Sequence, residues 1–170
     1  MNLLSRLYNP ADNRVLYVFC VFAASLLLAI ASQFLIPLLP VPVTLQSFVI
    51  LAMAMILGMK LSRDITFSYL LLGAIGFPVF TGGLGGMVVL WGTTGGYLVG
   101  FFFAAVAAGY LADKGWCRHF MGSLFVATIG TMIIFACGIT WLATLLGVTQ
   151  AIQFGLMPFL LGAVLKLIAA

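Results

Sequence analysis

Charge is the property that this sequence has least of. Among 170 residues there are three acids, seven Lys or Arg and one His, which makes 6% charged residues, whereas 65% of the chain is hydrophobic. Soluble domains carry roughly a quarter charged residues. A water-soluble protein of this size could not cover its surface with so few charges, so the composition excludes a soluble domain. It predicts an integral membrane protein whose apolar residues face a lipid bilayer.

Groups that carry catalysis or bind metal ions are also scarce. The acids and the histidine all border apolar runs: Asp12, Asp64, Asp113 and His119. No Ser/His/Asp set, carboxylate pair or ligand cluster can be assembled from them inside a membrane. The three cysteines fit no metal or redox spacing, and the basic residues are scattered without the stripe that nucleic acid requires. We therefore predict no enzyme, no cofactor, no metal site and no nucleic-acid partner.

Long apolar runs supply the structure instead. Six can be delimited, at residues 15–39, 44–59, 65–77, 97–112, 120–142 and 160–170. Helices satisfy their backbone groups internally, so we expect an all-α bundle of six transmembrane helices forming one domain over residues 1–170. Polar links are expected at 60–64 and 113–119, and a loop with one short helix at 143–159. The last run gives only about 16 Å of helix against a roughly 30 Å core, so we expect a truncated last helix.

The positions of the cations predict an orientation. If residues 1–14 are cytoplasmic, six of the seven cations fall on the cytoplasmic side: Arg6, Arg14, Lys60, Arg63, Lys114 and Arg118. This distribution follows the positive-inside rule. The seventh cation, Lys166, lies within the last apolar run.

Thr44 and Gln46 follow prolines at the predicted outer side and enter the second run. The Gln side chain offers both a donor and an acceptor, which suits a neutral polar ligand. It equally suits a hydrogen bond to a neighbouring helix, and the sequence leaves both interpretations open.

A glycine-rich stretch from Gly82 and Gly83 onward is the second candidate region. Glycine lets the backbone approach a ligand closely, and irregular backbone at membrane depth survives only when it is buried or lines a cavity. Phe80, Trp91 and Tyr97 are candidates for the flat walls of a site. Alternatively, Trp and Tyr anchor the protein at the membrane interface.

Lys166 is the third candidate. A lone cation in an apolar segment is costly and indicates a functional site by default. It would suit the carboxylate of a substrate, unless its side chain reaches back to the interface.

Four segments resemble one known family. Residues 41–46 read VPVTLQ, which resembles a signature of the BioY family, the biotin-specific substrate-binding subunits of energy-coupling factor (ECF) transporters. Residues 69–80 and 82–101 fit the same family, as does Trp141 with the later segment 158–166. The resemblance implies a six-helix subunit in the inner membrane of a prokaryote, with both termini cytoplasmic and a biotin pocket near the outer face. It also implies two partners, a transmembrane coupling subunit and a pair of ATPases. Biotin would be the transported ligand and not a cofactor.

The resemblance gives roles to the candidate residues. Thr44 and Gln46 would meet the polar head of biotin, Phe80, Trp91 and Tyr97 its rings, and Lys166 its carboxylate. Ser25 and Ala29 carry the small-residue spacing expected of a docking surface for the coupling subunit.

One departure from the family keeps other functions open. Ala163 stands where the family usually has Asp, three residues before Lys166. A related subunit for another small carboxylated vitamin, or a non-transporting scaffold with a decayed pocket, therefore remains an alternative.

Overall fold

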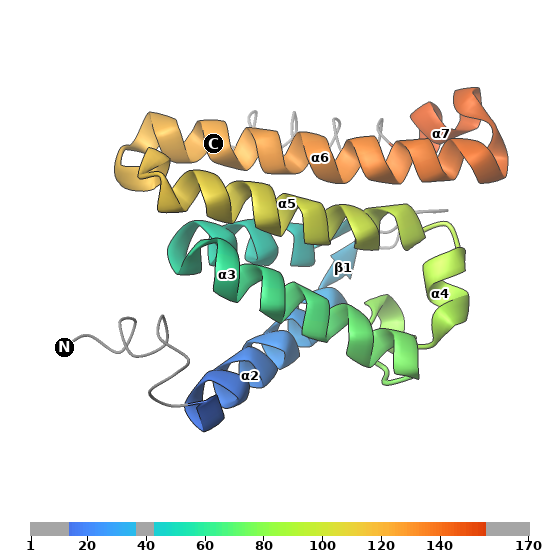
Figure 1. The fold of residues 1–170 in the computed structure, drawn as a ribbon. Coiled ribbons are helices and arrows are strands. Elements are labelled where there is room, and N and C mark those ends of the chain that lie inside the picture. Colours follow the sequence, from blue (N-terminus) through green and yellow to red (C-terminus); the bar gives the residue numbers. More distant parts are fainter. Residues whose placement is uncertain (1–13, 37–42, 156–170) are drawn as a thin grey trace.

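Four long helices dominate the computed structural model, which describes residues 14–36 and 43–155. They are α2 (Arg14–Gln33), α3 (Gln46–Ile75), α5 (Gly95–Asp113) and α6 (Phe120–Leu146), shown in Figure 1. The shorter elements are η1 (Thr81–Gly83), α4 (Met87–Trp91), η2 (Trp116–Arg118) and α7 (Val148–Gly155). The sixth apolar run and Lys166 lie outside the described residues, so the count of six helices and the truncation stay predictions.

In the described part of the chain, three helices are apolar and long enough to cross a bilayer: α2, α5 and α6. The bounds of α5 and α6 lie within four residues of the predicted runs 97–112 and 120–142, whereas α2 ends at Gln33, six residues before the predicted end of the run 15–39. α5 lies between α3 and α6 (Figure 1). Its small residues allow this close packing: a Cβ on Gly100 would come within 3.0 Å of the Ile134 Cα of α6. The described part is therefore a helical membrane protein built around α5.

α3 contains two helical halves that meet at Gly58. This glycine has φ 77° and ψ 178°, a conformation that essentially only glycine adopts. The first half runs alongside α5, so that Gly58 and Met59 contact Gly109. The second half returns along α5, where the Ser62 hydroxyl donates to the Ala105 carbonyl at 3.2 Å.

The prediction of a non-helical polar link at 60–64 is therefore wrong. Those residues are helical and begin the second half of α3, while a single glycine makes the reversal. A helical start is possible because the Asp113 carboxylate accepts from the Met59 amide at 3.0 Å and so caps the new helix.

A short strand pair joins the end of α2 to the start of α3. Strand β1 (Leu35–Ile36) pairs antiparallel with β2 (Val43–Thr44), with Leu35 opposite Thr44. The Leu45 amide also donates to the Phe34 carbonyl at 3.0 Å. This strand pairing was not predicted from the sequence. The pair fixes Thr44 beside the end of α2.

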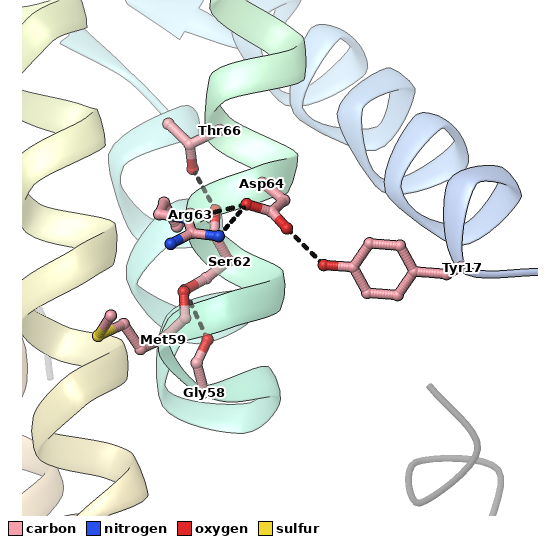
Figure 2. Close-up of polar contacts among 7 residues, drawn as sticks. All are labelled: Tyr17, Gly58, Met59, Ser62, Arg63, Asp64 and Thr66. Atoms are coloured by element: carbon pink, nitrogen blue, oxygen red, sulfur yellow. Dashed lines mark hydrogen bonds and ion pairs between the residues drawn. The ribbon is translucent and has the colours of Figure 1, made fainter. Parts of the chain in front are cut away.

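Charged side chains gather at one end of the bundle. Asp64 accepts from the Tyr17 hydroxyl at 2.5 Å and from Arg63 Nε at 2.8 Å (Figure 2). Lys60 Nζ lies 5.9 Å from the centroid of the Tyr17 ring. The start of α2, the reversal of α3 and the end of α5 therefore meet at this charged end. All Lys and Arg of the described residues lie here: Arg14, Lys60, Arg63, Lys114 and Arg118.

Candidate ligand cavity

A cavity of about 710 Å³ lies at the opposite end of the bundle, among the first half of α3, the 80–94 segment, α5 and α6. Pockets for small ligands commonly enclose about 300–1,000 Å³. None of the described residues lining it is charged. Its wall is mostly aliphatic and aromatic, with a few hydroxyl and amide groups: Thr44, Gln46, Ser47, Phe48, Leu51, Met55, Phe80, Thr81, Leu84, Gly85, Val88, Val89, Gly92, Thr93, Thr94, Tyr97, Leu98, Phe101, Ala127, Thr131, Ile134 and Phe135.

Thr44 and Gln46 are brought to this cavity by the β1–β2 pair and the first turn of α3. Gln46 is 1% exposed, and its Nε2 finds no acceptor among the described residues. An unsatisfied buried amide is costly unless something binds it. The neutral hydrogen-bonding groups predicted from the sequence therefore lie at the cavity wall.

Phe80 forms another part of the wall and is held on several sides. Its ring is 1% exposed and packs edge-on against Tyr69, with centroids 5.5 Å apart. Gly73 makes room for it, since a Cβ there would overlap the Phe80 ring. The preceding Val79 carbonyl accepts from the Ser32 hydroxyl at 2.8 Å and from the Tyr69 hydroxyl at 3.0 Å. The position of this aromatic wall is thus set by α2 and α3 together.

Tyr97 enters the cavity from the first turn of α5. Its ring packs against Gly138 of α6, where a Cβ would overlap it. Its hydroxyl donates to the Gly155 carbonyl at 3.1 Å, at the end of α7. Tyr97 therefore joins the cavity wall to the last described helix.

The other candidates lie elsewhere. Gly82 and Gly83 are exposed, and neither lines the cavity. Trp91 is 66% exposed and packs against Trp141, with ring centroids 5.8 Å apart. The short α4 presents Val88 and Val89 to the cavity instead. The binding roles of Gly82, Gly83 and Trp91 stay predictions, as does that of Lys166 outside the described residues.

The two residues of the predicted docking surface face different surroundings. Ser25 is 1% exposed, and its hydroxyl lies 2.8 Å from the Val21 carbonyl and 3.0 Å from that of Ile65. It thus packs within the bundle against α3. Ala29 is partly buried. Their role toward a partner stays a prediction.

Several lining residues escaped the sequence analysis because they are ordinary apolar residues of helices. Leu98 and Phe101 follow Tyr97 along α5, and Ile134 and Phe135 come from α6. Helical spacing from Tyr97 points to Phe101, which lies one turn later on the same face. No comparable sequence pattern predicted that α6 would contribute residues to the cavity wall.

The BioY family matches residues 7–170 of this chain. The chain is 39% identical over 145 residues to the biotin transporter BioY of Thermotoga maritima, covering 85% of each chain. It is 38% identical over 141 residues to the biotin transporter BioY of Rhizobium etli, covering 78% of this chain and 75% of the relative. The crystal structure of an S-component for biotin from an ECF-type ABC transporter shares the fold, with a TM-score of 0.71 and 24% identity, covering 86% of this chain and 84% of that one. The chain belongs to the BioY family.

Proposed function

We propose that this chain takes up biotin, as the membrane-embedded subunit that captures the vitamin in the cavity between α3, α5 and α6. Residues 1–170 then act as one transmembrane substrate-binding domain. The observation that carries this function is a cavity of about 710 Å³, whose described lining residues are uncharged and largely apolar, in a chain 39% identical to a biotin transporter.

The chemistry of biotin suits this cavity. Its fused rings need apolar walls, which Phe80 and Tyr97 supply. Its ureido group needs neutral hydrogen-bonding partners, for which Gln46 and Thr44 are candidates. Its carboxylate needs a cation, and we assign this role to Lys166, the only Lys or Arg that follows Arg118 in the sequence.

The position of the charges supports an orientation. The described cations lie at the end of the bundle opposite the cavity, which under the positive-inside rule supports a charged end in the cytoplasm and a cavity toward the outer face. We infer an inner-membrane location, a cytoplasmic N-terminus and inward delivery driven by a coupling subunit with a pair of ATPases. We assign the docking surface to α2, with Ala29 at its edge.

Two measurements test the function. Titration calorimetry of the purified chain in detergent is expected to show saturable biotin binding. Cells that produce the chain with the coupling module are expected to accumulate radiolabelled biotin faster than cells without the chain. Tighter binding of dethiobiotin or of another vitamin would reassign the substrate. If no vitamin binds while partner association is retained, the chain is a scaffold and the proposal fails.

A further inference from the structure

We propose that Ser32, at the end of α2, is a positioning residue for the ligand cavity. It holds the Val79 carbonyl and thereby keeps the Phe80 ring in place as a wall. This inference rests on the proposed function, because its consequence is read as a change in biotin affinity. Ser32 does not line the cavity and acts only through the neighbouring segment.

The contacts of Ser32 reach across 47 residues of sequence. Ser32 is fully buried, and its hydroxyl lies 2.7 Å from the Ala29 carbonyl of its own helix and 2.8 Å from the Val79 carbonyl. Gln33 adds a second connection, since its Nε2 donates to the Phe80 carbonyl at 3.1 Å and to Ser32 Oγ at 2.9 Å. The last turn of α2 therefore holds two successive carbonyls of the segment that carries the wall.

Phe80 has little room for another position. It follows a turn in which Gly76 has φ 115° and Pro78 removes one backbone donor. Its ring fits over Gly73, and its amide donates to the Leu84 carbonyl at 2.9 Å. Without the Ser32 hydroxyl, the Tyr69 hydroxyl is the one side-chain donor left on the Val79 carbonyl among the described residues. The Ser32 hydroxyl is therefore one of the few contacts that fix the Val79 carbonyl, and its loss is expected to weaken the hold on this segment and on the Phe80 ring.

The same end of α2 is also connected to a second part of the cavity wall, at Thr44. β1 begins two residues after Gln33 and pairs with β2, which carries Thr44 two residues before Gln46. A movement of the last turn of α2 therefore reaches both Phe80 and Thr44. This arrangement distinguishes Ser32 from a serine that merely fills a gap between two helices.

Ser62 provides the matched control. It is 2% exposed, and its hydroxyl lies 2.6 Å from the Gly58 carbonyl of its own helix and 3.2 Å from the Ala105 carbonyl of α5. It thus makes the same kinds of contact as Ser32, but at the charged end, away from the cavity. Ser32→Ala and Ser62→Ala are expected to lower the thermal midpoint of the full chain in detergent to a similar extent.

Biotin affinity separates the two variants. Titration calorimetry is expected to give Ser32→Ala a Kd about fivefold higher than the unchanged chain, equivalent to about 1 kcal/mol, and Ser62→Ala a Kd within about twofold of it. In a Phe80→Leu background, Ser32→Ala is expected to add no further loss, because both changes act through the same side chain.

The possible outcomes distinguish a failure of the proposed function from a failure of the role proposed for Ser32. If the unchanged chain does not bind biotin, the proposed function fails. If it binds and Ser32→Ala leaves the Kd unchanged, or Ser62→Ala raises it equally, only the role of Ser32 is overturned. Additive losses in the Phe80→Leu background would likewise show that Ser32 does not act through Phe80.

Discussion

The two ends of the helical bundle close their turns by different chemistry. At the charged end, the reversal at Gly58 is capped by the Asp113 carboxylate, and Asp64 bonds Tyr17 and Arg63. At the cavity end, the turn after α3 ends in the positive-φ Gly76, and neutral hydroxyls hold the Val79 carbonyl. Both turns thus use a glycine together with side-chain contacts from another helix, but only one uses a charge.

The difference reflects the solvent at each end. Charged groups within an apolar environment are costly, whereas those at an interface keep their contact with water. The partly exposed Asp64 and Arg63 are compatible with water at the charged end. Neutral donors to backbone carbonyls can be buried completely, as Ser32 is. In the described part of the chain, neutral hydrogen bonds therefore hold the cavity end, which leaves its wall suited to an apolar ring.

The largest effect that we predict at the cavity end is that of replacing Lys166, which lies outside the described residues. If its ammonium group meets the carboxylate of biotin, Lys166→Ala removes a buried charge partner. Such losses cost about 2–5 kcal/mol, so the Kd for biotin is expected to rise roughly 30-fold or more. Titration calorimetry in detergent measures the change.

Lys114→Ala is the matched control, because it removes a lysine from the charged end and is expected to leave the Kd unchanged. If the Lys166→Ala variant and the unchanged chain bind biotin with equal affinity, Lys166 does not bind the carboxylate, and our assignment of this cation to the cavity is wrong.

The charged end is tested by Gly58→Ala. Alanine at this position would have to adopt a backbone conformation that costs about 1–3 kcal/mol. It would also overlap Asp113 and disturb the cap on the Met59 amide; loss of such a helix cap typically costs about 1 kcal/mol. Thermal unfolding in detergent is expected to show a clear loss of stability, with biotin affinity retained in the folded fraction.

Gly147→Ala isolates the backbone contribution. Gly147 has φ 87° and ψ 157°, close to the values at Gly58, but no atom lies within 4 Å of the position of a Cβ. Gly58→Ala is expected to destabilise the protein more than Gly147→Ala does. In an Asp113→Ala background the difference should vanish; a difference that persists would show that the contact with Asp113 is not its cause.

The sequence predicted the long helices better than the turns between them. Continuous apolar runs bounded by polar residues placed α5 and α6 within a few residues of their observed bounds. The reversal of α3 was misplaced, since Lys60, Arg63 and Asp64 indicated a loop. Charges at a membrane interface can equally lie on the first helical turns, and the glycine just before them was the better signal.

The cavity was predictable where an unusual residue marks it. Gln46 stood out as an amide in an apolar run, and it lies at the cavity wall. Ser32 and Tyr69 gave no signal, because their partner is a backbone carbonyl that no sequence pattern reveals. Trp91 was selected for its flat ring, but the short α4 turns that ring toward Trp141.

Tyr97→Phe tests how firmly the cavity end is connected to α7. The change keeps the ring against Gly138 and removes the hydroxyl that donates to the Gly155 carbonyl. A single neutral hydrogen bond is worth about 0.5–1.5 kcal/mol, so the Kd for biotin is expected to rise about two- to tenfold. Tyr110→Phe, at the other end of α5, is the control and should not change the Kd. If both variants bind alike, the hydroxyl of Tyr97 does not contribute to the site.

The smallest expected effect concerns Cys117, in η2 at the charged end. Burial raises the pKa of this thiol, while Ser123 acts in the opposite direction as the weaker influence. Because the thiolate is the reactive form, labelling by a maleimide at neutral pH should be slower than for a free thiol. Its rate should keep rising at pH values where a free thiol has levelled off. A membrane-impermeant maleimide should label Cys117 only after the cells are opened, with Cys117→Ser as the blank. Labelling in intact cells would place the charged end outside and reverse the orientation of the cavity.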